Sequence, residues 1–233
     1  QREQKVVAFM DRHAHLPTML HGAMVRIYEA VICPFADFMS RPHWLMILLF
    51  VALYKYGEAL LGVMANPFYL DLGFSKSEIA AVSKGYGLAM TLIGGYVGGV
   101  MVARLGIMRA LLYAGIFQCL ANLAFALQAM VGYSVPMLAV TISIENLTAG
   151  MATSAFIAYL SSLCNVAYTA TQYALLSSLM NVTRTVFAAG GGWLAESLDW
   201  TGYFVLTTFA AVPGLIVLVW LMKREPAREP LLQ

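Results

Sequence analysis

Six apolar stretches of about 20 residues recur along this chain and restrict its fold more than any other feature. A helix needs about 20 mostly apolar residues to cross roughly 30 Å of hydrocarbon. Hydrophobic residues make up 61% of the sequence and charged residues only 11%, unlike a soluble domain. The sequence therefore predicts an all-α membrane protein with six transmembrane helices. Its spans are residues 44–64, 79–102, 110–130, 137–162, 169–194 and 203–222.

Outside the spans, the sequence divides into a linker and a tail. Residues 1–40 contain a helix-like apolar pattern between two prolines, which indicates either an amphipathic helix on the membrane surface or a solvated linker helix. Residues 41–222 form the predicted bundle, and residues 223–233 form a tail. Because the chain begins with Gln1 and a linker-like segment, we expect that an N-terminal part is missing.

The basic residues indicate which side of the membrane each connection occupies. Short cytoplasmic loops of bacterial membrane proteins carry an excess of lysine and arginine. With the N-terminus inside, the outer loops hold only Lys76. We therefore expect a multi-pass protein of the bacterial inner membrane with both ends of this chain in the cytoplasm. The basic residues on the cytoplasmic side would be Arg2, Lys5, Arg12, Arg26, Arg41, Arg104, Arg109, Lys223, Arg224 and Arg228.

Charged residues inside the spans are the main functional signal, because each costs about 3 kcal/mol near the bilayer centre unless it is paired or hydrated. Lys55 and Glu58 lie three residues apart on one helical face, with Tyr54 beside them. They either take part in function or neutralise each other for insertion. Glu145 and Asn146 begin a polar stretch of the fourth span, which indicates a cavity wall or an acid that serves helix packing.

The fifth predicted span carries polar residues at helical spacing. Ser177, Asn181 and Arg184 recur on one face, and Arg184 lies too deep for easy snorkelling to the headgroups. We expect its guanidinium to meet an anion, which is either Glu145 or a carboxylate of a substrate. Lys84 is different, because it lies near the end of the second span and can snorkel to the surface.

Several other classes of function find no support in the sequence. Its three cysteines are widely scattered, which fits neither a disulfide framework nor a metal site. No nucleophile with a base and an orienting group is evident, so we expect no enzyme, no metal and no cofactor. The basic residues form no single stripe, which argues against nucleic acid. Paired small residues at Gly94, Gly95, Gly98 and Gly99 predict close helix packing.

The segment GVMVARLG at residues 99–106 is similar to the loop motif of major facilitator transporters. That motif has an aspartate at the position of Ala103 and basic residues at the positions of Ile107 and Met108, so the match is partial. The resemblance implies a gating loop whose residues are Gly99, Arg104, Gly106 and Arg109.

Other segments closely resemble AmpG-type muropeptide permeases. They are ENLTAGMATSAF at 145–156, LCN at 163–165, ATQYALLSS at 170–178, and Tyr54, Lys55 and Glu58 in the first span. The resemblance covers residues 30–222. It implies the C-terminal half of a twelve-span major facilitator fold, with two inverted repeats of three spans. It further implies a proton symporter that imports anhydromuropeptides by alternating access, with roles in peptidoglycan recycling and the β-lactam response. The proton gradient would take the place of a cofactor.

The polar residues at membrane depth and the family motifs together define a candidate substrate and proton pathway. We hypothesise that Glu58 or Glu145 exchanges the coupling proton, since burial favours the neutral form of a carboxyl group. Lys55 and Arg184 would then hold anionic groups of the cargo. The pathway residues are Tyr54, Lys55, Glu58, Glu145, Asn146, Gln172, Ser177, Asn181 and Arg184.

Three alternatives stay open at this point. A family member could carry another polar cargo, such as an acyl-coenzyme A. The chain could be a complete half-transporter that acts as a homodimer. It could also be a non-transporting membrane partner whose buried charges only specify helix pairing. The expected partners are the lipid bilayer, a small-molecule muropeptide and the missing six-helix half.

Overall fold

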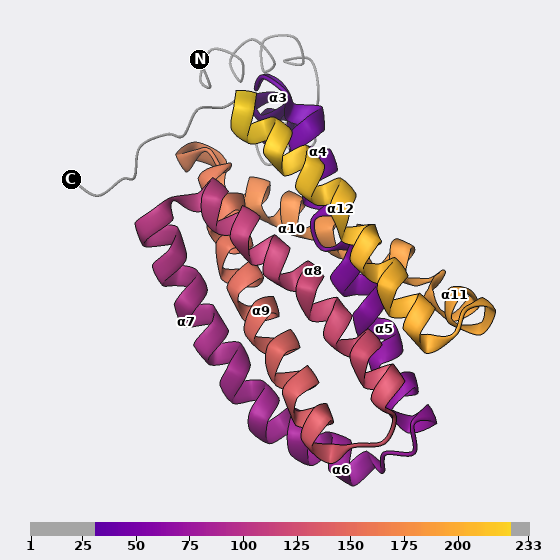
Figure 1. The fold of residues 1–233 in the computed structure, drawn as a ribbon. Coiled ribbons are helices and arrows are strands. Elements are labelled where there is room, and N and C mark those ends of the chain that lie inside the picture. The colour runs from indigo at the N-terminus through magenta and orange to yellow at the C-terminus, as the bar shows by residue number, and fades with distance from the viewer. Residues whose placement is uncertain (1–30, 225–233) are drawn as a thin grey trace, which may run out of the picture.

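The computed structural model describes residues 31–224. Within that range every regular element is a helix (Figure 1). The amphipathic helix expected in the linker and most of the expected tail lie outside the described residues. The elements are α3 (Cys33–Met39), α4 (Trp44–Leu53), α5 (Tyr56–Asp71), α6 (Lys76–Ala81), the π-helical η2 (Val82–Gly87), α7 (Leu88–Leu105), α8 (Ile107–Val131), α9 (Val135–Ser162), the 3₁₀ helix η3 (Val166–Tyr168), α10 (Thr169–Ala188), α11 (Gly191–Ser197) and α12 (Trp200–Arg224).

Five helical segments of the described chain are long and apolar enough to cross a membrane. They correspond to the first, second, third, fourth and sixth predicted spans, and they confirm the all-α membrane fold. Their bounds are Trp44–Asp71, Lys76–Leu105, Ile107–Val131, Val135–Ser162 and Trp200–Arg224.

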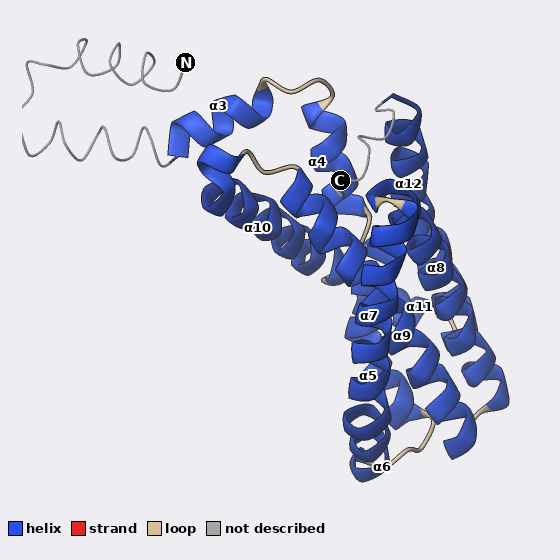
Figure 2. Cartoon of the chain, turned by 90° about the vertical axis from the view of Figure 1, so that its left-hand side faces the viewer, coloured by secondary structure: helices blue, strands red, loops and turns tan. Residues whose placement is uncertain are grey.

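The fifth predicted span, residues 169–194, differs from the prediction. It is divided into α10 and α11 by a turn at Ala189 and Gly190, so the helix ends at Ala188. It also does not reach the apolar character of the other five segments, because α10 carries an arginine and several Ser, Thr, Asn and Gln residues. In Figure 2, α10 and α3 project to one side of the other helices.

The first span is interrupted at Tyr54 and Lys55, two of the pathway residues that the sequence predicted. Helix α4 ends at Leu53 and α5 begins at Tyr56, so Tyr54 and Lys55 form the break. The Tyr54 hydroxyl donates a hydrogen bond to the carbonyl oxygen of Leu111 on α8 at 2.8 Å. Its ring stacks on Phe156 of α9, with 5.2 Å between the ring centroids. The break is therefore held in place by two other helices.

Helices α7 and α9 pack through small residues. A methyl group at Gly98 would lie 2.6 Å from the carbonyl oxygen of Met151, and one at Gly94 would overlap the carbonyl oxygen of Leu147. On the facing helix, a methyl group at Gly150 would meet α7 in the same way. This confirms the predicted close packing for Gly94 and Gly98.

The charge asymmetry of the sequence matches the two ends of the bundle. The turn between α7 and α8, helix α3 and the end of α12 lie at one end, and α6 lies at the other (Figure 1). The described basic residues of the α3 end are Arg41, Arg104, Arg109, Lys223 and Arg224.

At the α6 end, the Tyr133 hydroxyl donates a 2.6 Å hydrogen bond to Glu78, which raises the pKa of Tyr133 above its ordinary value.

Candidate functional site

The core is divided into two apolar clusters, and polar residues lie between them along the chain. The first cluster contains Phe50 and Phe156, and the second, nearer α6, contains Phe68 and Phe125. On α5, α8, α9 and α12, the polar positions fall between the residues of the two clusters. Six polar residues of this region are called the polar layer: Lys55 just before α5, Glu58, Gln118, Asn122, Glu145 and Thr207.

Lys55 and Glu58 form the ion pair that their spacing predicted. Their side chains are 11% and 16% exposed, so the pair is largely buried. The Lys55 ammonium also donates a 3.0 Å hydrogen bond to the Thr153 hydroxyl of α9. The pair therefore links the break in the first span to the fourth span.

Glu145 and Arg184 add two charges to this pair. Glu145 interacts electrostatically with Glu58, Lys55 and Arg184, although it forms no hydrogen bond or ion pair within residues 31–224. The exposed Arg184 guanidinium approaches α5, because a methyl group at Gly62 would lie 3.7 Å from it. Of the two anions that the sequence offered for Arg184, Glu145 forms no direct ion pair with it within residues 31–224. Three helices thus bring two carboxyl groups and two cations near one another.

The remaining predicted pathway residues at membrane depth bond mainly to the helices themselves. Asn146 points to the glycine-rich interface, where it accepts a 2.9 Å hydrogen bond from Thr91 of α7. Ser177 and Asn181 donate hydrogen bonds to carbonyl oxygens of their own helix, α10, and Asn181 is exposed. Asn146 therefore lies at a packing interface rather than beside Glu145, because adjacent helical residues point in different directions.

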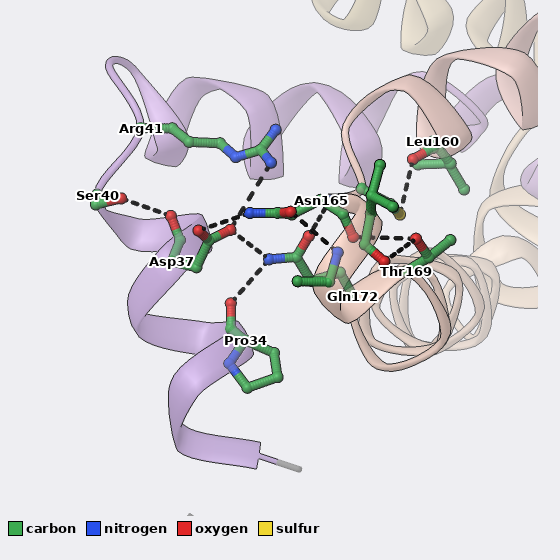
Figure 3. A network of polar contacts seen from close by, with 11 residues as sticks. Pro34, Asp37, Ser40, Arg41, Leu160, Asn165, Thr169 and Gln172 are labelled. Carbon is green, nitrogen blue, oxygen red and sulfur yellow. Dashed lines mark hydrogen bonds and ion pairs between the residues drawn. The ribbon is translucent and has the colours of Figure 1, made fainter. Parts of the chain in front are cut away.

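Gln172 lies in a separate polar network at the α3 end of the bundle, not beside the charged group (Figure 3). Its side chain is 1% exposed and donates to Asp37 at 2.8 Å and to the carbonyl oxygen of Pro34 at 3.0 Å. It accepts from the backbone amide of Asn165, whose side chain also donates to Asp37. Arg41 approaches the same carboxylate at 3.9 Å. This network ties α3 to the turn between α9 and α10.

We predict that Gln172→Leu lowers the free energy of unfolding by about 1–3 kcal/mol, because it leaves buried polar groups without partners. Unfolding in detergent, followed by circular dichroism, measures the change. Ser161→Ala is the matched control, since the exposed Ser161 hydroxyl bonds only within its own helix. Equal stability of the two variants would contradict a structural role for the network.

The predicted gating loop forms the tight turn between α7 and α8. Gly106 has a φ of +81° there, a conformation that favours glycine. A methyl group at Gly99 would meet open space. Arg104 and Arg109 are exposed, and neither forms an ion pair within the described part of the chain. No charge latch is therefore formed among these residues.

Three polar residues of the layer were not predicted from the sequence: Thr207 and two amides of α8. Gln118 and Asn122 of α8 are 6% and 0% exposed, and their side-chain amides have no hydrogen-bond partner among the described residues. Gln118 lines a small pocket with Tyr54, Lys55 and Glu58. The available signal was a pair of amides four residues apart, on one helical face of a span whose residues 110–130 include no charged side chain.

A metal centre receives no support from the described residues, in which no three His, Cys, Asp or Glu side chains come together. The four charged groups instead resemble a site for a polar, charged molecule. Such groups at membrane depth typically mark the path of a substrate or a proton.

Comparison with known proteins identifies the family. The chain is 43% identical over 198 residues to the putative transporter AmpG 4 of Rickettsia felis, an alignment that covers 84% of this chain and 47% of that protein. It is 38% identical over 192 residues to the anhydromuropeptide permease of Escherichia coli K12, with 82% and 39% covered. The chain thus spans less than half the length of these curated relatives. The model of the Major Facilitator Superfamily matches residues 29–232, and this chain therefore belongs to the major facilitator superfamily.

Proposed function

We propose that this chain is the C-terminal six-helix half of a proton-coupled transporter that imports anhydromuropeptides across the bacterial inner membrane. One observation carries the proposal: the break in the first span, α5, α9 and α10 bring Lys55, Glu58, Glu145 and Arg184 near one another. The relatives support the cargo, since one of them is named as an anhydromuropeptide permease. Their names also favour a transporter over an enzyme.

The balance of charge in this group links an anionic cargo to a proton. With both carboxyl groups ionised, the two glutamates and the two cations cancel. A carboxylate of the cargo, held by the planar guanidinium of Arg184, leaves one negative charge in excess. A proton on Glu58 or Glu145 removes that excess, which is costly inside a membrane. Each ligand thereby favours binding of the other, as proton symport requires.

The Lys55–Glu58 ion pair gives the proton a second effect. While Glu58 is ionised, it holds the Lys55 ammonium. Once Glu58 is protonated, the pair is weakened and Lys55 becomes free to bind an anionic group of the cargo. Release of the proton to the cytoplasm restores the pair and expels the cargo. Alternating access would move the layer between the two sides, with a second six-helix half opposite α5 and α10 and both ends of this chain in the cytoplasm.

Uptake of labelled anhydromuropeptide tests the proposal. Cells that lack their own permease would express this chain alone or joined to the N-terminal half of an AmpG permease, with insertion verified in both. We expect uptake by the joined protein that disappears when the proton gradient is collapsed. Uptake that is equal without a gradient would exclude proton coupling, and no uptake despite correct insertion would exclude this cargo.

We predict that Glu58→Gln or Glu145→Gln lowers gradient-driven uptake by roughly 10²-fold, the usual range for loss of a proton-transferring group. Exchange of labelled for unlabelled cargo without a gradient should be retained, because it needs no net proton movement. Glu196→Gln on the exposed part of α11 is the matched control. Full gradient-driven uptake by both variants would contradict the assignment of the coupling proton to this group.

A further inference from the structure

Four polar atoms on α8 are buried beside the charged group without partners. They are the amide nitrogen and oxygen atoms of Gln118 and Asn122, none of which has a hydrogen-bond partner within residues 31–224. Nearly all other buried polar groups in proteins are bonded to protein or to ordered water. In a membrane span, lipid cannot supply the bonds. Internal water is the partner that fits four such atoms.

The position of these amides connects them to the ion pair. Gln118 lines the same small pocket as Lys55 and Glu58, and the pocket has room for about one water molecule. Asn122 lies one helical turn further along the same face of α8, towards the α6 end. The two amides thus form a polar strip that begins at Glu58 and points to the outer side of the proposed topology.

The surroundings make this strip distinct from the rest of α8. Apolar cluster residues precede it at Ala114 and follow it at Phe125. In contrast, Gln128 on the same helix is also buried but has partners, since it accepts from Thr141 and donates to the carbonyl oxygen of Gly132. Among residues 31–224, the buried amide of Gln128 is therefore satisfied by protein groups, whereas those of Gln118 and Asn122, on the stretch of α8 that reaches the ion-pair pocket, are not.

We propose that Gln118 and Asn122 hold buried water that carries the coupling proton to Glu58. Each amide both donates and accepts, so it orients water without taking the proton itself. A proton from the outer aqueous phase would pass along the water, and the Glu58 carboxylate would accept it from the last water molecule. The charged or titratable groups that interact with Glu58 are Lys55, Tyr54 and Glu145, and Arg184 interacts in turn with Glu145. The proton route depends on the proposed proton coupling, whereas the water site does not.

The test replaces each amide by an apolar group of similar size. Gln118→Leu and Asn122→Leu remove the donors and acceptors, while Gln118→Asn keeps both. The first readout is X-ray radiolytic labelling of the whole transporter, read by mass spectrometry, because hydroxyl radicals from bound water mark neighbouring side chains such as Tyr54. The second compares gradient-driven uptake with gradient-independent exchange. Gln128→Leu is the matched control, since it removes an amide whose partners are protein groups.

We expect both leucine variants to lower labelling at Tyr54. We also expect them to reduce gradient-driven uptake by about 10- to 100-fold, as is usual when an outer hydrogen-bond partner of a functional group is removed. Gradient-independent exchange should be retained. Gln118→Asn should recover most of the uptake, and Gln128→Leu should keep both labelling and coupling. Unchanged labelling would overturn the water site. Lowered labelling with normal uptake would overturn the proton route. A parent protein without uptake would instead contradict the proposed function, while its labelling still tests the water site.

Discussion

Replacing Lys55 by methionine is expected to lower the free energy of unfolding by about 3–5 kcal/mol, the usual cost of removing one partner from a buried ion pair. The reason is that Glu58 would then be left among helices without its counter-ion, and the Thr153 hydroxyl would lose its link to α5. Unfolding of the purified protein in detergent, followed by circular dichroism, measures the loss. Lys84→Met is the matched control, because the exposed Lys84 forms no ion pair within the described residues.

The double variant Lys55→Met, Glu58→Leu separates the two interpretations of the pair. Apolar replacement of both partners commonly restores stability, so we expect the double variant to unfold close to the parent protein. If the pair takes part in transport, the double variant is stable but lacks gradient-driven uptake. If it takes up cargo normally, the pair only permits insertion into the membrane. A single variant as stable as the parent would show that Glu58 has another partner.

Local spacing explains which parts of the site were predictable. Lys55 and Glu58 are three residues apart, so helical geometry alone places them together. The same is true of the close approach at Gly94 and Gly98, since two small residues four apart present one smooth face. Membrane spans follow from length and apolar character, and five of the six were found where the sequence placed them.

Long-range packing explains the rest. The partners of Gln172 are on α3, more than 130 residues earlier in the chain, and no local pattern reveals that contact. Asn146 follows Glu145 directly, but its direction depends on which helix packs against that face. Gln118 and Asn122 were overlooked because they are uncharged, although a buried amide also requires a partner. It is the packing of α8 against the first span that places Gln118 in the same pocket as Lys55 and Glu58.

The contact between α7 and α9 allows the second large effect to be predicted. Gly94→Ala adds a single methyl group, which would overlap the carbonyl oxygen of Leu147. Ordinary contacts of carbon atoms are about 3.5–4.0 Å, so the two helices must separate. Their backbones are held close by the facing Gly150, and the hydrogen bond from Ser154 to the carbonyl oxygen of Gly95 depends on the same approach. We expect the free energy of unfolding to fall by about 1–3 kcal/mol.

Gly99→Ala is the control, because it makes the same chemical change on the same helix where the added methyl group meets open space. In α-helices alanine is favoured over glycine by about 1 kcal/mol, so Gly99→Ala should be neutral or slightly stabilising. That preference also acts at Gly94, which means that the difference between the two variants measures the steric cost of the contact. Equal unfolding of both variants in detergent would show that α7 and α9 do not approach this closely. A loss confined to Gly94→Ala would establish that the second and fourth spans pack closely at this glycine. That contact fixes the position of α9, and therefore of Glu145.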